Sequence, residues 1–502
     1  MQENAPILAW LRGIAHEGAH LRLDSRDVKP GDIFVAVPGE RTDGRAFIRV
    51  AAARGAAGVL LEKRDGEGGH YPVAALAVEG LKERLGEIAA EYYGNPSERM
   101  TGVAVTGTNG KTTTAFWTAE LFTRLGVDAG TIGTVGAFFK GRRLPGPHLT
   151  TPDALSLEHL YAELLRAGAR AFSVEASSAG LDQGRLNGSR FKVGIFTNLT
   201  RDHLDYHGTM EAYRDAKAKL FSWPGLEAAV LNAEDPASVE FARRAREAGV
   251  PVWATGAKEA AEAFAQREGA AHVVAASGVE PSSEGTAFTI HFDQCAARVE
   301  LPIIGGFNVT NMLGVVAAAL ACGFGFGDVL PHLPHLAPPP GRMERIPSGG
   351  AAPLVLVDYG HTPDALEKAL KSLRPTAEAR GGRLWAIFGC GGDRDRGKRP
   401  MMGSAASRFA DRVVVTSDNP RSEDPETIIR EILAGCDGPA EVTPRVDRRE
   451  AVVEAVASAA PEDVVLVAGK GHESEQILKD GPHPYRDDEA VREGFNERRV
   501  RG

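Results

Sequence analysis

The sequence has few cysteines and no excess of basic residues, and each shortage excludes a class of protein. Its 502 residues include four cysteines at scattered positions, Cys295, Cys322, Cys390 and Cys436. Without C-x-x-C spacing they indicate neither a zinc site nor a disulfide framework, and they suit a reducing compartment. The formal net charge of -9 argues against a general nucleic-acid binder, because neutralising phosphates requires clustered Lys and Arg.

Long apolar runs are also missing. Glu3 and Arg12 bracket the short stretch PILAW, and the longest weakly polar run, residues 313–327, is rich in Ala and Gly. Both are shorter than the ~20 residues of a membrane span, and PILAW is too short for the core of a secretory signal. We therefore expect a cytoplasmic protein with no membrane insertion and no nucleic-acid partner. We also expect a monomer.

The length predicts two to four domains, at roughly 100 to 200 residues each. Hydrophobic residues at 43% and charged residues at 25% are ordinary for a soluble globular chain. Gly, Asn and Pro interrupt the pattern at 94–96, and three consecutive prolines do so at 338–340. These breaks predict domains at 1–99, 100–339 and 340–502.

Apolar strands alternate with helical segments in the second and third of these domains. The strand segments are AFSVEAS, VGIFTNL, AAVLNAE, PLVLVDYG, RLWAIFGC, DRVVVTSD and DVVLVAGK. This alternation predicts an α/β fold with parallel, doubly wound sheets, which bind ligands at the carboxyl ends of their strands. One helix is expected to start at Thr151-Pro152-Asp153, with an N-cap there and Pro in its first turn, and to end at Gly168.

A glycine loop, VTGTNGKTTT, lies between the apolar strand GVAV and a helix. A standard P-loop would have Gly where this chain has Val105. Even so, Gly107 and Gly110 would let the main chain approach a phosphate at the helix N-terminus, where backbone N–H groups and the helix dipole favour an anion. Lys111 would reach the terminal phosphates and Thr112 would hold Mg²⁺. A plain glycine turn is the alternative, and the GKT run at the junction favours the phosphate.

The variant T-G-T-N-G-K-T resembles the ATP loop of the Mur ligases and the related folylpolyglutamate synthases, which are ATP-dependent amide-forming ligases. The resemblance implies a three-domain architecture with a central P-loop ATPase domain and a C-terminal Rossmann-like doubly wound domain. It also implies that the whole loop contacts ATP through Thr106, Gly107, Thr108, Asn109, Gly110, Lys111, Thr112 and Thr113.

Two residues that follow strands complete the metal prediction. Glu175 lies in VEASS and His203 in NLTRDHLDYHG, and the resemblance implies that both bind magnesium with Thr112. The alternatives are a capping glutamate and a surface histidine. His203 and His207 have the i, i+4 spacing of a zinc protease, but Leu204 stands where H-E-x-x-H requires Glu.

Lys217 in AYRDAKAKLF matches a lysine that Mur ligases carry as an N-carbamate, a neutral amine that has captured CO₂, and the resemblance implies that in this form it is a fourth magnesium ligand. This hypothesis requires a lowered ammonium pKa. The alternative is a solvated helix lysine beside Lys219. One departure from the family follows Glu175, because Ser177 and Ser178 precede Ala179 where similar ligases have histidine.

Four further residues match nucleotide contacts of the family. The resemblance implies that Asn308 in GGFNVTN, with Asn311, meets the purine, that Arg342 in PPPGRMER meets the γ-phosphate, and that Asp358 in LVDYGHTPDAL binds the ribose. A helix cap is the alternative for the asparagines. A rotating third domain would then close the ATP site, exclude water and protect an acyl phosphate.

The segment LDSRDVKPGDIFVAVPGERTDGR resembles the UDP-binding part of the family members that extend UDP-N-acetylmuramoyl-L-alanyl-D-glutamate during peptidoglycan precursor synthesis. Turn formation at Pro38 and Gly39 is the alternative explanation for these residues. The resemblance assigns the uridine nucleotide to Leu23, Ser25, Glu40, Arg41 and Thr42, and the sugar dipeptide to Thr150, Thr151, Ser177, Gln183 and Arg185.

The run SDNPR resembles the motif that selects meso-diaminopimelate, which differs from lysine by a second carboxylate. An Asx-Pro turn is the alternative. A guanidinium binds a carboxylate through two parallel hydrogen bonds, so Arg421 would select the diacid. Glu473 would meet the distal ammonium. The predicted amino-acid contacts are Arg394, Asp418, Asn419, Pro420, Arg421, Gly469 and Glu473.

The predicted activity is therefore the ATP-dependent addition of meso-diaminopimelate through an acyl phosphate. Three alternatives stay open: a ligase of the same type that adds lysine, a folylpolyglutamate synthase, and a P-loop switch that binds nucleotide and a protein partner. Arg421 favours addition of meso-diaminopimelate over addition of lysine. A UDP-type segment before Met100 disfavours the synthase.

Overall fold

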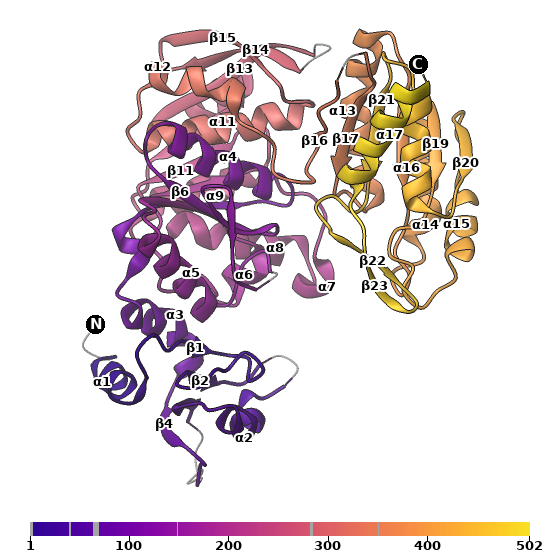
Figure 1. Ribbon diagram of the computed structural model, residues 1–502. Coiled ribbons are helices and arrows are strands. Elements are labelled where there is room, and N and C mark those ends of the chain that lie inside the picture. The colour runs from indigo at the N-terminus through magenta and orange to yellow at the C-terminus, as the bar shows by residue number, and fades with distance from the viewer. Residues whose placement is uncertain are drawn as a thin grey trace. The chain divides into compact units, whose positions relative to one another are not determined.

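The computed structural model describes residues 4–39, 42–63, 70–147, 149–281, 285–349 and 351–501. They fall into two compact units (Figure 1). Unit 1 takes its residues from 1–275 and 312–332, and unit 2 takes its residues from 276–311 and 333–502. Within the described ranges, no helix combines the length and the hydrophobicity needed to cross a bilayer.

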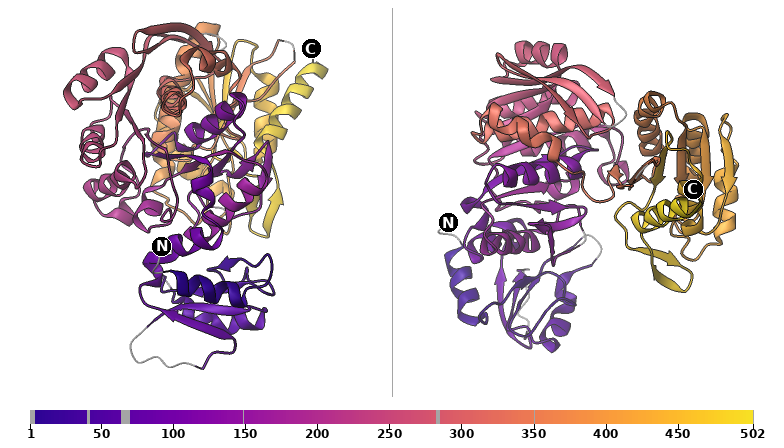
Figure 2. Two further views of the ribbon diagram at one scale, coloured as in Figure 1. Left: turned by 90° about the vertical axis from the view of Figure 1, so that its left-hand side faces the viewer. Right: turned by 45° about the horizontal axis from the view of Figure 1, so that its top comes forward.

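Unit 1 begins with a four-stranded parallel sheet in the order β1-β2-β3-β4. Its elements are α1 (Ala5–Ile14), β1 (Leu21–Arg22), β2 (Ile33–Ala36), η1 (Gly44–Phe47), α2 (Ile48–Ala53), β3 (Gly58–Glu62), β4 (Ala74–Val78), α3 (Leu81–Tyr92) and η2 (Pro96–Arg99). Buried side chains of α1 and α3 pack on one face of the sheet, and those of α2 pack on the other. Figure 2 shows this layering (left view).

A large sheet follows in unit 1, with the strand order β13-β12-β11-β10-β5-β9-β6-β7-β8. The strands from β12 to β6 are parallel, and β7 and β8 are antiparallel. The bounds are β5 (Thr101–Thr106), β6 (Ala129–Gly133), β7 (Gly136–Phe139), β8 (Arg142–Leu144), β9 (Ala171–Glu175), β10 (Val193–Phe196), β11 (Ala228–Asn232), β12 (Val252–Ala257) and β13 (His272–Pro281). Strands β9, β10 and β11 are buried throughout, as expected for parallel strands covered on both faces.

The helices that accompany this sheet are α4 (Lys111–Arg124), α5 (Ala154–Arg166), α6 (Ser178–Asp182), α7 (Leu204–His207), α8 (Met210–Ala218), η3 (Lys219–Ser222), α9 (Ala237–Glu247) and α10 (Lys258–Glu268). The prediction of an N-cap for α5 within Thr151-Pro152-Asp153 is confirmed, but the prediction that Pro lies in the first turn is wrong. The Asp153 carboxylate accepts hydrogen bonds from Leu155 N and Ser156 N, both 3.1 Å, so Asp153 is the N-cap and Pro152 precedes the helix. The predicted end is confirmed, because Gly168 follows the last turn with a φ of 98°.

Unit 2 contains a doubly wound sheet with the order β16-β17-β21-β18-β19-β20, parallel except at β16. Helices α13, α14 and α15 pack on one face, and α16 and α17 pack on the other. The strand bounds are β16 (Glu344–Arg345), β17 (Leu354–Asp358), β18 (Leu384–Phe388), β19 (Arg412–Val415), β20 (Glu441–Pro444) and β21 (Val464–Ala468), and the helix bounds are α13 (Pro363–Arg380), α14 (Lys398–Phe409), α15 (Pro425–Leu433), α16 (Arg448–Ser458) and α17 (Asp487–Arg501).

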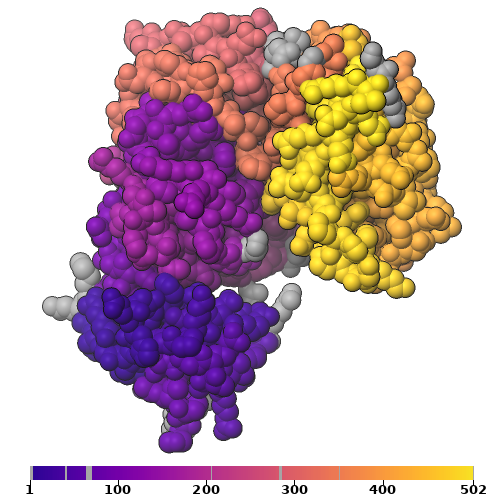
Figure 3. Space-filling view, in the orientation of Figure 1, coloured from indigo at the N-terminus to yellow at the C-terminus, as the bar shows by residue number. Residues whose placement is uncertain are grey.

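The remaining elements are two hairpins and a linking helical segment. Strands β14 and β15 are antiparallel, as are β22 and β23. Their bounds are β14 (Thr286–Phe292), β15 (Cys295–Leu301), β22 (Glu475–Leu478) and β23 (Gly481–Pro484), and the helical segment comprises α11 (Gly306–Ala321), α12 (Phe326–Val329) and η4 (Leu330–His335). In the space-filling view, the yellow helix α17 lies on the surface of unit 2 (Figure 3).

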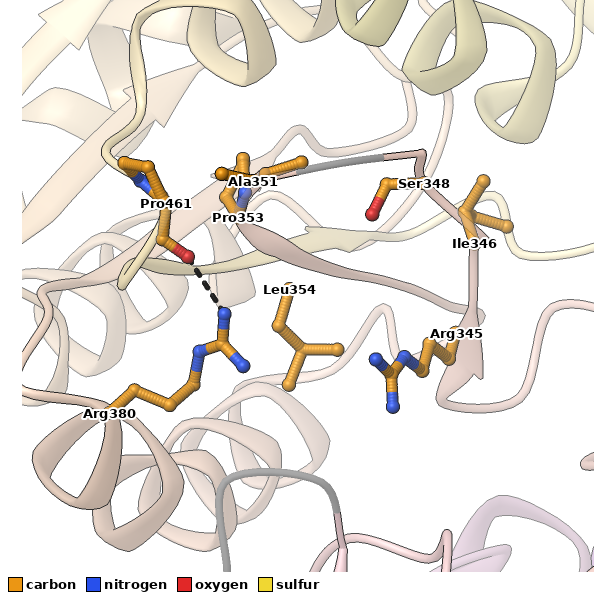
Figure 4. A pocket seen from close by; sticks show the side chains of 9 residues that line it. Arg345, Ile346, Ser348, Ala351, Pro353, Leu354, Arg380 and Pro461 are labelled. Atoms are coloured by element: carbon orange, nitrogen blue, oxygen red, sulfur yellow. Dashed lines mark hydrogen bonds between the residues drawn. The ribbon is translucent and has the colours of Figure 1, made fainter.

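A cavity of about 310 Å³ lies in unit 2 at the start of β17, and Arg345 and Arg380 line it together with Leu354 (Figure 4). Nη2 of Arg380 donates to the carbonyl of Pro461 at 2.7 Å, and its Nε donates to that of Glu462 at 3.2 Å. Arg380 therefore ties the end of α13 to the turn before β21. The cavity is at the amino edge of this sheet, whereas α/β sheets bind ligands at the carboxyl edge.

Candidate active site

The glycine loop joins β5 to α4 and is held by the end of the neighbouring strand β10. The carbonyl of Asn198 accepts from Thr108 N at 2.7 Å, and Thr197 Oγ1 donates to the carbonyl of Asn109 at 2.6 Å. Gly107 has a φ of 146°, and a Cβ there would lie 1.9 Å from Thr197 Oγ1. Both the backbone angle and the close approach therefore require glycine at this position.

Two lysines share one carbonyl of this loop. Nζ of Lys111 donates to the carbonyls of Gly107 and Thr108, both at 2.9 Å, and Nζ of Lys217 donates to that of Gly107 at 2.8 Å. Lys217 is buried, with its Nζ 4.4 Å from the centre of the Tyr213 ring. Burial, and then the charge of Lys111, hold the pKa of Lys217 well below its usual range. A neutral amine is thus favoured at this position.

Besides Lys217 in α8, three predicted metal ligands come from three further parts of the chain. Val105 and Glu175 are paired in register on β5 and β9, so the Glu175 carboxylate is at the strand edge where the loop begins. Thr112 is buried in the first turn of α4. His203 precedes α7 with a φ of 52°, and its Nε2 is 3.6 Å from Asp202 Oδ2 on an exposed surface. The described residues contain no group of three or more His, Cys, Asp or Glu that could hold a metal by themselves.

This donor set suits magnesium. Mg²⁺ usually takes one or two protein carboxylates together with waters and the phosphates of its nucleotide, rather than a dedicated cage of side chains. The hydroxyl of Thr112 and the carboxylate of Glu175 are hard oxygen donors beside a phosphate-type loop. The residues present therefore fit a nucleotide-bound magnesium ion.

A cavity of about 780 Å³ in unit 1 brings together residues predicted to bind two parts of one substrate. Leu23, Ser25 and Thr42 from the uridine prediction line it, and so do Gln183 and Arg185 from the sugar-dipeptide prediction. Its lining also includes Leu149, next to Thr150. Glu40 and Arg41 lie outside the described residues.

Hydrogen bonds lead from this cavity toward the glycine loop. Nη1 of Arg185 donates to the carbonyl of Thr151 at 3.0 Å, and Thr151 Oγ1 donates to the carbonyl of Glu175 at 2.6 Å and lies 2.9 Å from Ser177 Oγ. A second connection runs through Thr134. The residues predicted to bind the substrate and the predicted metal ligand Glu175 are therefore parts of one network.

Thr134 is a member of this network that the sequence analysis missed. Its backbone N donates to Glu175 Oε1 at 2.8 Å, its hydroxyl is 3.2 Å from Glu175 Oε2, and the same hydroxyl is 3.0 Å from Thr150 Oγ1. The only sequence signal was a threonine at the turn after a buried strand. That position is common and does not by itself indicate a contact with Glu175.

In unit 2, the SDNPR segment follows β19 and is fixed through the side chain of Asn419. Its Oδ1 accepts from Lys470 Nζ and from Ile477 N, both at 2.9 Å, and its Nδ2 donates to Glu473 Oε2 at 3.0 Å. Lys470 is fully buried and also donates to Glu473 Oε2 at 2.8 Å. Lys470 was missed as a site residue, although it stands between the predicted Gly469 and Glu473.

Arg421 is held so that one edge of its guanidinium is left for a ligand. The backbone at Arg421 has a φ of 53°, and Nη1 donates to the carbonyls of Gly392 at 2.9 Å and Asn419 at 3.3 Å. Within the described part of the chain, Nε and Nη2 make no hydrogen bond. These two nitrogens form the edge that binds a carboxylate through two parallel hydrogen bonds.

Two glycines, Gly391 and Gly469, lie close to the predicted amino-acid contacts of unit 2. A Cβ on Gly391 would lie 2.9 Å from Arg421 Nη1 and 3.5 Å from Arg394 Cγ, so both arginines flank this glycine. Gly469 has a φ of 115°, and a Cβ there would lie 2.7 Å from Asp418 Oδ2. The predicted amino-acid contacts therefore converge at the carboxyl ends of the strands of the doubly wound sheet in unit 2.

The remaining predicted nucleotide residues also belong to unit 2. Both Asp358 oxygens accept backbone hydrogen bonds, from Gly360 N at 2.7 Å and Met343 N at 2.8 Å. The guanidinium of Arg342 stacks 4.7 Å from the centre of the Tyr359 ring. Asn308 is buried and donates from Nδ2 to the carbonyl of Ile304 at 2.9 Å.

Comparison with known proteins places the chain in one protein family. Three profiles of one family cover the chain: the Mur ligase family catalytic domain at residues 19–93, the Mur ligase middle domain at 105–319, and the Mur ligase glutamate ligase domain at 341–471. The chain belongs to the Mur ligases, a family of ATP-dependent amide-forming ligases with a three-domain α/β architecture.

Several similar proteins share one name. The chain is 47% identical to the UDP-N-acetylmuramoyl-L-alanyl-D-glutamate--2,6-diaminopimelate ligase of Ralstonia nicotianae, over 97% of this chain and 95% of that protein. It is also 47% identical to the enzyme of the same name from Pseudomonas aeruginosa, over 93% of each. A solved structure of a ligase with this name superimposes with a TM-score of 0.69 at 36% identity, covering 96% of this chain and 95% of that one.

Proposed function

We propose that the protein is an ATP-dependent ligase that adds meso-diaminopimelate to UDP-N-acetylmuramoyl-L-alanyl-D-glutamate in peptidoglycan precursor synthesis. Relatives with this name, at 47% identity over nearly the whole chain, support the proposal. The observation that carries the choice of amino acid is Arg421, whose Nε and Nη2 edge suits a second carboxylate.

In the proposed reaction, ATP transfers its γ-phosphoryl group to the γ-carboxylate of the D-glutamyl residue and gives an acyl phosphate. The amine of diaminopimelate then attacks the acyl carbon, and the tetrahedral intermediate expels phosphate to leave the amide. No enzyme nucleophile is required. The protein contributes by positioning the reactants and by offsetting negative charge with Lys111 and Arg342.

Magnesium would be held by Thr112, Glu175, His203 and a carbamate on Lys217. When bound, the ion would neutralise charge on the phosphates of the nucleotide. We propose the carbamate because Lys217 is buried and its pKa is lowered, so its amine is available to capture CO₂. In that form Lys217 would present oxygen atoms instead of an ammonium group.

The residues predicted from the sequence would bind the UDP-linked substrate, ATP and the amino acid. Arg185 would bind an anionic part of the UDP-linked substrate with Gln183, Thr150, Thr151 and Ser177. Asn308, Arg342 and Asp358 would meet the purine, the γ-phosphate and the ribose of ATP. In unit 2, the amino acid would be bound by Arg394, Asp418, Asn419, Pro420, Arg421, Gly469 and Glu473.

We also propose the domain boundaries 1–99, 100–339 and 340–502, within which the three family profiles lie. The protein is proposed to act as a cytoplasmic monomer.

The decisive experiment is ADP formation with the UDP-linked muramyl dipeptide, comparing meso-diaminopimelate with L-lysine. The proposal expects turnover that depends on the amino acid and strongly prefers the diacid. Preference for lysine would instead identify a lysine-adding ligase, and activity on a folate acceptor would identify a folylpolyglutamate synthase. ATP hydrolysis that ignores every amino acid would favour a nucleotide switch.

A further inference from the structure

The substrate cavity of unit 1 is lined by five charged side chains, and four of them have partners. Arg26 Nη2 is 2.6 Å from Asp24 Oδ2. Asp153 caps α5 through the N–H groups of Leu155 and Ser156. Arg185, the fourth, donates to the carbonyl of Thr151 and to Gln183 Oε1, the latter at 2.8 Å.

Lys82 is the fifth charged residue of the lining. It is exposed, and its ammonium group makes no hydrogen bond or ion pair with any described residue. Only its backbone is engaged, because Lys82 N donates to Glu62 Oε2 at 3.0 Å. Lys82 is therefore a cation without a partner among the described residues, whereas the two carboxylates and two arginines that line the same cavity all make hydrogen bonds or ion pairs.

The position of Lys82 is not explained by helix stability. It is the second residue of α3, where the positive end of the helix dipole disfavours a cation by about 0.3–1 kcal/mol. The Glu62 carboxylate accepts hydrogen bonds from the N–H groups of Gly80 and Lys82, and an ammonium group has no acceptor with which to cap a helix N-terminus. A lysine here suits an anion that enters the cavity.

We propose that Lys82 binds the diphosphate of the UDP-linked substrate. This inference rests on the proposed function, which places a nucleoside diphosphate in this cavity. The exposed apolar side chains of Phe47, Val50 and Leu149 line the same cavity and offer surface to the uncharged parts of the ligand. Lysine binds phosphate as a point charge, and its flexible stem lets the ammonium follow the two phosphate groups.

The test compares the full-length protein with the variants Lys82→Gln and Lys82→Arg. We expect Lys82→Gln to raise the KM for the UDP-linked substrate about tenfold, which corresponds to about 1.4 kcal/mol. The KM values for ATP and for the amino acid, and kcat, should stay within twofold. Lys82→Arg should restore most of the affinity because it keeps the charge. Lys63→Gln, an exposed lysine after β3 that does not line the cavity, is the matched control.

Binding of UDP and of uridine separates this inference from the proposed function. Lys82→Gln should weaken UDP binding about tenfold by calorimetry, while uridine binding, followed by ligand-observed NMR, stays unchanged. An unchanged KM and UDP affinity in Lys82→Gln would overturn the inference, as would an equal loss for uridine or an equal effect of Lys63→Gln. If the wild-type protein bound UDP but did not turn over the muramyl substrate, the proposed function would fail while the role of Lys82 could still be measured.

Discussion

Replacing Arg421 by Gln should convert a diacid-selective site into one that no longer distinguishes diaminopimelate from lysine. In the structure, Nη1 is committed to the carbonyls of Gly392 and Asn419, so the Nε and Nη2 edge is the part that discriminates. A hydrogen bond to a charged group contributes about 1.5–3 kcal/mol, and truncating one partner of a charge pair costs about 2–5 kcal/mol. Loss of two such bonds predicts a fall in kcat/KM for diaminopimelate of roughly 10²- to 10³-fold.

The assay is phosphate release at saturating ATP and UDP-linked substrate, with each amino acid varied in turn. The small kcat/KM for lysine should change much less, because lysine has no second carboxylate to lose. Arg408→Gln, which removes a surface pair with Asp437 in the same unit, controls for loss of a guanidinium elsewhere. Arg421→Gln with an undiminished preference for diaminopimelate would refute the reasoning.

Three further perturbations have expected outcomes. Gly107→Ala should abolish ATP binding in a calorimetric titration and lower the free energy of unfolding by at least about 1–3 kcal/mol, because the added Cβ would lie 1.9 Å from Thr197 Oγ1 at a φ of 146°. Gly126→Ala is the control: its Cβ would meet nothing within 4 Å, so ATP binding should stay intact. Lys217→Arg should lose most turnover while staying folded, and wild-type activity should fall in CO₂-depleted buffer and return with bicarbonate; full activity in both tests would exclude the carbamate. Burial raises the pKa of Glu158 from 4.5 to about 8, so folding takes up a proton and stability should fall as pH rises from about 4.5 to about 8. Glu158→Gln should flatten this part of the pH profile in urea unfolding and stabilise the protein above pH 8, and an unchanged slope would contradict the assignment.

Much of the fold followed from local patterns. The strands around the glycine loop, the end of α5 at Gly168 and the doubly wound C-terminal sheet are as predicted, because buried parallel strands and helix-ending glycines leave signatures within a few residues. One detail at the start of α5 was predicted wrongly. Pro152 was expected in the first helical turn, but the carboxylate of Asp153 accepts hydrogen bonds from the first N–H groups of the helix. Asp153 is therefore the N-cap, and α5 begins at Ala154.

In the candidate site, too, the residues in contiguous motifs were predicted from the sequence, and residues that act through distant partners were not. The loop at 106–113 and the SDNPR run are contiguous, so their chemistry could be read from neighbouring residues. Thr134 and Lys470 were missed, because each acts through a partner 41 or 51 residues away in the sequence, Glu175 and Asn419 respectively. No local pattern reports such a pairing.

The sequence by itself determined the family, the phosphate loop and the type of amino acid expected, since these depend on residue identity and order. Only the tertiary structure decided that Lys217 is buried with a lowered pKa and that, among the described residues, neither one edge of the Arg421 guanidinium nor the ammonium of Lys82 at the unit 1 cavity has a partner. The physical reason is that burial, pairing and solvation are set by segments distant along the chain. The charge and reactivity of a side chain depend on those surroundings as much as on its own chemistry.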